Sequence, residues 1–198
     1  MKTPHRLQVK LFFVDPQAVP PSDFVPVFHR WIQRGSIDQL LIDVHNYSHV
    51  HEGTGILLVG HEGDFAIDGA SGRTGLLYTL KRGDHYTFAA AVRVALRRVA
   101  LGATLLQQER ALRDRIAFDL AHFELMIPDR LTYPNRVDVF EAIKEELSSV
   151  ILQASGVANV SLERIDNDAR EPLAIRATMP EPLPLSDLAT ATVAEGIG

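Results

Sequence analysis

The chain has 198 residues, a formal net charge of −5 at pH 7 and no cysteine. Its length allows one domain of about 150–200 residues or two smaller ones, and its 46% of hydrophobic residues is ordinary for a globular protein with a core of its own. The lack of cysteine excludes disulfides, thiolate nucleophiles, iron–sulfur clusters and cysteine-based zinc sites. The acidic balance argues against a general nucleic-acid binder.

The first half of the chain predicts a strand, a helix and then a series of short strands. A strand rich in Val and Phe is expected at residues 7–14, where prolines end it. Asp23 is placed to cap a helix that Gly35 terminates. The Gly-Ala-Ser-Gly sequence at residues 69–72 favours a hairpin turn. Further strands are expected at residues 39–44, 56–59, 65–68 and 75–80.

A long helix is the main predicted element of the second half. It is expected at residues 85–115, with Asp84 as its N-cap and with a bend or break at Gly102. The elements expected after it are a strand at 121–127, a helix at 135–154 with Asn135 as its cap, and two hairpin strands at 157–165 and 173–178.

These elements predict an α+β fold with a mainly antiparallel sheet and a long central helix. Two βαβ-like units on either side of that helix suggest a ferredoxin-like pseudo-duplication. One domain is expected at residues 1–179, with sub-units 1–83 and 119–179 joined by the helix at 84–118. Residues 180–198 contain several prolines and are expected to form a flexible tail that is available to a protein partner.

The long helix also suggests self-association. Between Phe88 and Leu106 it is apolar on more than one side, so more than one layer must bury it. It is therefore either central to the fold or part of a subunit interface, and we predict a homo-oligomer through residues 85–115. Arginines interrupt its apolar run, and no signal peptide is evident, so we expect a cytoplasmic protein without a membrane span.

The common catalytic motifs are absent from the sequence. It holds no phosphate-binding P-loop, no dinucleotide-binding glycine pattern before a helix, no G-x-S-x-G nucleophile elbow, no H-E-x-x-H pair and no EF-hand loop. These absences favour a binding protein over an enzyme of these classes.

A histidine-rich segment carries the only predicted metal site. If the strand that begins at residue 39 continues, His49 and His51 lie on one face, and His61 or Glu62 from the next strand completes a set of three ligands. Such a site predicts a metalloenzyme with a divalent transition metal, in which Glu62 or Asp64 is a ligand or general base. The alternative is that these side chains are solvated residues at strand ends. The histidines of the segment are His45, His49, His51 and His61.

Two further side chains are candidates for ligand binding. Tyr47 and Arg73 are expected in the same sheet, where they can form hydrogen bonds to a ligand, as can Tyr78 and Arg82. Each of the four also has an ordinary interpretation as a surface or half-buried residue.

Charge is unevenly distributed along the chain. Residues 81–115 contain eight basic and three acidic residues, a net charge of +5, which leaves −10 for the rest. One hypothesis is an anion- or nucleic-acid-binding stripe that includes Arg97 and Arg98. The interpretation we favour is a helix face paired with acidic neighbours, so nucleic acid is not an expected partner. The acidic residues proposed as those neighbours are Asp138, Glu141, Glu145 and Glu146.

Three functions follow from the sequence. The first is an oligomerising protein that binds a ligand or partner and has no evident catalytic motif. The second is the cysteine-free metalloenzyme, and the third is the anion or nucleic-acid binder that uses the arginine-rich helix.

Overall fold

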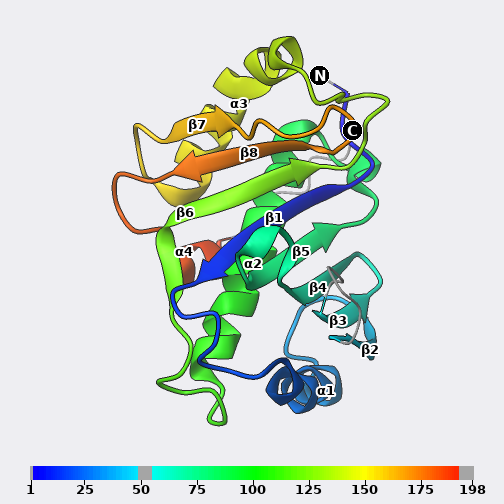
Figure 1. Cartoon of the computed structure of the whole chain (residues 1–198), viewed down its shortest axis with the longest axis vertical. Coiled ribbons are helices and arrows are strands. Elements are labelled where there is room, and N and C mark those ends of the chain that lie inside the picture. Colours follow the sequence, from blue (N-terminus) through cyan, green and yellow to red (C-terminus); the bar gives the residue numbers. More distant parts are fainter. Residues whose placement is uncertain (1, 49–54, 192–198) are drawn as a thin grey trace.

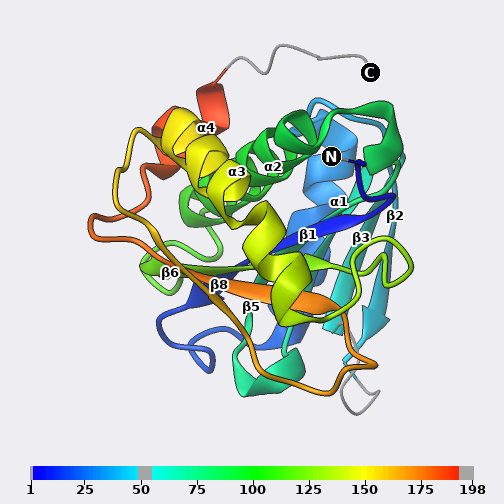
Figure 2. The same cartoon turned by 90° about the horizontal axis from the view of Figure 1, so that it is seen from above.

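A computed structural model describes residues 2–48 and 55–191 of the chain. They form an α+β structure in which the helices lie on one face of an antiparallel sheet (Figures 1 and 2). The strands are β1 (Leu7–Phe13), β2 (Leu41–Tyr47), β3 (Gly55–Gly60), β4 (Gly63–Asp68), β5 (Gly75–Leu80), β6 (Phe118–Ile127), β7 (Ser161–Arg164) and β8 (Leu173–Thr178). The helices are α1 (Phe24–Arg34), α2 (Phe88–Gln108), α3 (Val137–Ser155) and α4 (Leu185–Thr190).

The described strands form one sheet in the order β2-β3-β4-β5-β1-β6-β8-β7, and each neighbouring pair is antiparallel. The predicted antiparallel sheet is confirmed, but the two βαβ-like units and the ferredoxin-like pseudo-duplication are not. Three strands separate β1 from β2, and β8 separates β6 from β7. The short connections from β2 to β5 make consecutive strands antiparallel neighbours, so the first helix does not join adjacent strands.

The core lies between the sheet and the helices. Leu7, Val9 and Leu11 of β1 are fully buried on the face that contacts α2, as the alternation of a strand requires. Trp31 of α1 meets the ring of Phe65 in β4 edge-on, with ring centroids 6.0 Å apart. This aromatic contact places α1 over the β2–β4 part of the sheet.

The long helix α2 differs from its prediction at both ends. Thr87, rather than Asp84, is the N-cap, and its hydroxyl accepts a hydrogen bond from the helix backbone at 3.2 Å. The helix ends at Gln108 and not at residue 115. Gly102 does not divide it. A side chain there would lie 2.8 Å from the ring of Phe65, so this glycine lets the helix approach the sheet.

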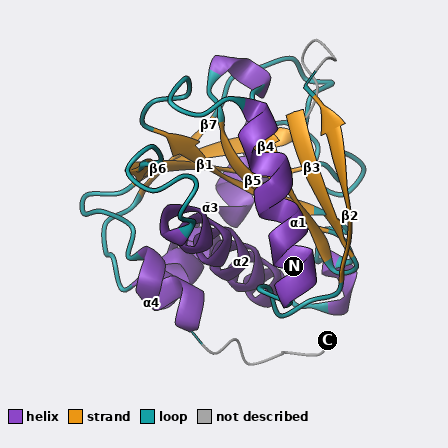
Figure 3. Cartoon of the chain, turned by 90° about the horizontal axis from the view of Figure 1, so that it is seen from below, coloured by secondary structure: helices purple, strands orange, loops and turns teal. Residues whose placement is uncertain are grey.

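The apolar surface of α2 is covered within the chain. The sheet packs on one side, and α3 and α4 pack on others, with α4 beside α2 in Figure 3. Leu183, Leu185 and Leu188 are buried there, and Leu185–Thr190 forms α4 within the range for which a flexible tail was expected, while residues 192–198 lie outside the described part. The observation that suggested a homo-oligomer through residues 85–115 is thus explained by the fold itself.

Strand β2 forms one edge of the sheet. Its pairing with β3 shifts register between Leu41 and Asp43, which marks a β-bulge. The carboxylate of Asp43 accepts a hydrogen bond from the Val44 N–H at 2.7 Å, so this backbone group has a partner within the chain. None of the helices in the described part of the chain is long and apolar enough to cross a bilayer.

Candidate ligand-binding site

A two-residue turn of His61 and Glu62 connects β3 to β4. The side-chain amide of Gln39 holds this turn, because it accepts a hydrogen bond from the Gly63 N–H at 3.0 Å and donates one to the Gly63 carbonyl at 3.2 Å. The His61 N–H donates to the Leu40 carbonyl at 2.8 Å. The turn is therefore fixed to the segment that leads into β2.

The side chain of Tyr78 lies directly behind this turn. A Cβ atom on Gly63 would lie 2.3 Å from the Tyr78 hydroxyl oxygen and 2.6 Å from the Thr79 carbonyl oxygen, so only glycine fits at this position. The Tyr78 hydroxyl is buried and has no hydrogen-bond partner among the described residues. Burial, only partly offset by Arg98, raises the pKa of Tyr78, so the hydroxyl is protonated at neutral pH.

A buried arginine connects the turn to α2. Arg98 is 7% exposed; its guanidinium donates to the carboxylate of Asp38 and, at 2.8 Å, to that of Glu62. Arg97 pairs with the same Asp38 at 2.9 Å. Burial alone would raise the pKa of Asp38, but Arg98 and Arg97 outweigh it and hold that pKa below its ordinary value. The cluster joins α2, the loop before β2 and the turn.

Arg82 has an unusual backbone conformation. Its φ of 79° and ψ of 43° lie in the left-handed region, which residues other than glycine rarely adopt. The N–H groups of Arg82 and Gly83 both donate to the His5 carbonyl, at 3.2 and 2.8 Å. This places Nη1 of Arg82 at 3.2 Å from Nε2 of His61. Because a guanidinium only donates, this contact is a hydrogen bond when Nε2 of His61 carries no proton.

These residues surround a cavity of about 240 Å³, which we call the turn cavity. The polar groups of its lining side chains are one guanidinium, two imidazoles, the Tyr86 hydroxyl and the Glu62 carboxylate that Arg98 binds. Its apolar lining comes from Leu80 and the ring of Tyr86. The lining residues are His61, Glu62, Leu80, Arg82, His85 and Tyr86.

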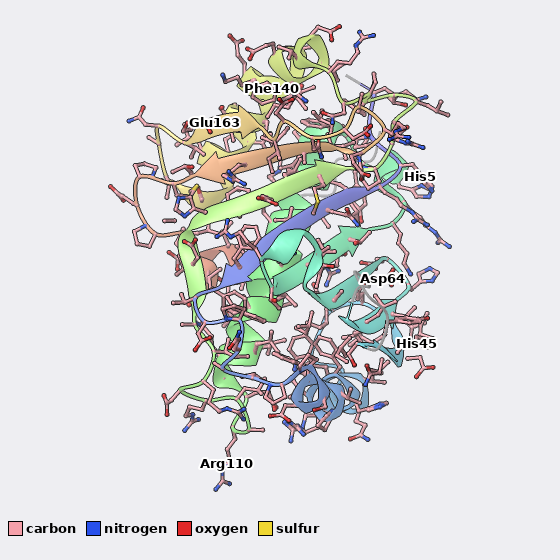
Figure 4. The ribbon with its side chains drawn as sticks, in the orientation of Figure 1. His5, His45, Asp64, Arg110, Phe140 and Glu163 are labelled. Carbon is pink, nitrogen blue, oxygen red and sulfur yellow. The ribbon has the colours of Figure 1, made fainter. Side chains whose placement is uncertain are left out.

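The two alternative candidates for a general base, Glu62 and Asp64, lie in different surroundings. Glu62 lines the turn cavity, whereas Asp64 pairs with Lys81 at 2.6 Å and accepts a hydrogen bond from the Gly60 N–H at 3.1 Å. In Figure 4 Asp64 lies on the same side of the molecule as His5. Asp64 thus secures the strands beside the turn.

The predicted metal ligands are only partly within the described residues, because His49 and His51 lie outside them. His45 and His61 do not converge. His45 pairs with Leu57 inside β3, whereas His61 follows the far end of that strand. No group of three or more His, Asp or Glu residues in the described part of the chain is placed to hold a metal ion.

The two predicted ligand-binding residues lie far apart in the sheet. Tyr47 is at the exposed edge in β2, stacked on His45 with ring centroids 6.0 Å apart. Arg73 stacks on Phe12 with its guanidinium carbon 3.7 Å from the ring centroid, and it donates to Asp119 at 3.2 Å. It lines a separate cavity of about 390 Å³ at the other end of β5 from the turn cavity.

The basic residues at 81–115 find partners other than those expected. No ion pair joins them to the acidic residues of α3 among the described side chains. Arg97 and Arg98 both pair with acidic residues of the fold, and the anion-binding stripe stays a prediction. The described ion pairs are Lys81–Asp64 at 2.6 Å, Arg97–Asp38 at 2.9 Å, Arg98–Asp38, Arg98–Glu62 at 2.8 Å and Arg115–Asp23 at 3.2 Å.

Sequence analysis missed His85, Tyr86 and Arg98 as parts of this site. Arg98 carried a usable signal, because a charged residue within an apolar helix stretch needs an internal partner. His85 and Tyr86 were assigned to the helix or its start and so were not considered. Comparison of the sequence with protein-family models and with curated proteins gives no match.

Proposed function

We propose that the protein binds a small organic anion, a molecule with a carboxylate or phosphate group, in the turn cavity. The observation that carries the proposal is the strained backbone of Arg82, which brings its guanidinium beside His61 at the cavity wall. Strain of this kind costs about 1–3 kcal/mol and is concentrated at functional sites.

Charge supports an anionic ligand. Glu62 is bound by Arg98, and no carboxylate lies within ion-pair distance of Arg82 among the side chains that the structure describes. The positive charge of Arg82 is therefore available in the cavity. A planar guanidinium and imidazole donors match the oxygens of a carboxylate or phosphate.

Size and apolar lining restrict the ligand further. Pockets for drug-sized ligands measure about 300–1,000 Å³, so a cavity of about 240 Å³ suits a smaller molecule. Leu80 and Tyr86 offer contact to one short apolar or aromatic group next to the anionic one. Benzoate and inorganic phosphate are suitable probes, since they have the anionic group with and without an aromatic ring.

The test is a titration of the full chain with each probe, followed by NMR of the histidine ring signals. We expect the signals of His61 and His85 to shift at probe concentrations of about 10 mM or below. The decisive variant is Arg82→Gly, which removes the guanidinium and relieves the backbone strain. It should lose binding without losing stability.

Asn159→Gly is the matched control. Asn159 also has a positive φ, of 58°, and lies in the loop before β7. Its replacement should relieve strain in the same way and leave binding unchanged. Absence of ring shifts with both probes, or binding that persists in Arg82→Gly, would contradict the proposal.

A further inference from the structure

A second cationic feature lies where α1 and α2 end. Figure 1 shows α1 and the end of α2 at the bottom of the molecule, and a groove of about 580 Å³ is found between them. We call it the arginine groove, and it is distinct in position from the turn cavity. Its lining residues are Arg30, Arg34, Gln108, Glu109, Arg110 and Ala111.

One ion pair holds the two helix ends together. Nη2 of Arg30 donates to Glu109 at 2.7 Å, and Nε lies 3.2 and 3.3 Å from the two carboxylate oxygens. The Glu109 side chain is only 12% exposed. This bidentate contact neutralises the negative charge of Glu109 and fixes the plane of the Arg30 guanidinium, which lines the groove.

The other two arginines of the groove have no carboxylate within ion-pair distance among the described side chains. Three arginines and one glutamate give the groove a net charge of +2 in a chain whose net charge is −5. Arg34 is in the last turn of α1, where a cation complements the helix dipole. Arg110 lies beyond the end of α2 and points into solvent (Figure 4). The helix dipole therefore does not account for the whole cluster.

From this arrangement we infer that the arginine groove binds a diphosphate group. Arginine forks bind phosphate oxygens in pairs, and two arginines without a carboxylate partner can each bind one of two linked phosphates. The groove is open and lined by few apolar side chains, so recognition rests on charge. This site is additional to the proposed anion site and does not depend on it.

Isothermal titration calorimetry of the full chain with inorganic pyrophosphate in low-salt buffer tests the inference. We expect a dissociation constant below about 1 mM, and binding at least about tenfold weaker in the double variant Arg34→Gln with Arg110→Gln. The control is Arg93→Gln, since Arg93 lies elsewhere on α2 and contacts Gln153 at 3.5 Å. This control should bind as the unchanged chain does.

Two results would overturn the inference. One is pyrophosphate affinity that is absent, or that is unaffected by the double variant while circular dichroism shows an intact fold. The other is loss of pyrophosphate binding in Arg82→Gly, which would place the ligand in the turn cavity instead. Failure of benzoate and phosphate to bind in the turn cavity leaves the pyrophosphate result untouched, so the two proposals fail separately.

Discussion

The turn cavity and the arginine groove present positive charge in two different ways. In the turn cavity a single guanidinium is positioned by a strained backbone, and buried groups behind the turn hold the walls in place. In the groove three guanidinium groups lie at the ends of α1 and α2, and the ion pair between Arg30 and Glu109 joins the two helix ends. The comparison indicates that the first site depends on packing and the second on charge. Salt should therefore weaken binding in the groove more than in the cavity.

The largest expected effect is on the free energy of unfolding, and it comes from the packing behind the turn. Gly63→Ala forces a Cβ against the Tyr78 hydroxyl and the Thr79 carbonyl, so we expect a loss of about 3 kcal/mol in the free energy of unfolding. Urea denaturation measures it. Gly69→Ala is the control, because its nearest atom would be 3.6 Å away, and its effect should be within about 0.5 kcal/mol. Equal stabilities of the two variants would show that the turn is not tightly packed.

Removal of the buried guanidinium should have the next largest effect. Arg98→Met leaves Asp38 and Glu62 without their main partner, but both carboxylates are about half exposed, so we expect a loss of about 2 kcal/mol. The released Glu62 can then compete with an anion for Arg82, so benzoate affinity should fall as well. Arg93→Met, on the same helix, is the control. Unchanged benzoate affinity in a folded Arg98→Met protein would show that the buried cluster does not affect binding in the turn cavity.

The ion pair of the groove should contribute less. Glu109→Gln removes the charge that Arg30 contacts, yet Arg30 is 30% exposed, and we expect a loss of at most about 1 kcal/mol. Pyrophosphate should bind more tightly, because a third guanidinium becomes available. Thermal unfolding and calorimetry measure the two effects. A loss of stability as large as that of Gly63→Ala would remove the distinction between the two sites.

The smallest expected effect is on the loss of stability at low pH. The pKa of Asp38 is lowered in the folded protein, so its ion pairs stabilise the fold above the unfolded pKa of about 4 and are lost as the pH falls below it. Asp38→Asn should therefore show a shallower loss of stability between about pH 5 and pH 2 than the unchanged chain. Urea denaturation at a series of pH values measures this. Parallel pH profiles would show that the arginines do not stabilise this carboxylate.

Local patterns predicted most strands and the hairpin at residues 69–72, because alternation and turn residues act over a few positions. They failed where contacts between residues far apart in the sequence determine the structure. Residues 180–191 resembled a tail, yet their leucines are buried against a helix some 80 residues away in sequence.

The same limit applies to the site. His61 and Glu62 were identified from their own segment. The apolar surroundings of Arg98 indicate that it needs a partner, but its partners lie 36 and 60 residues away, so the local sequence does not identify them. The predicted metal site assumed that the histidines of this segment, His45 and His61 among them, lie at neighbouring strand ends that meet. Antiparallel pairing instead places these residues at different levels of the sheet.

The bulged edge strand β2 has a consequence for behaviour at high concentration. Because Asp43 already occupies the Val44 amide and adds a negative charge, an incoming strand from another molecule finds no regular ladder to extend there. We therefore expect the Asp43 carboxylate to oppose growth of the sheet into fibrils through this edge.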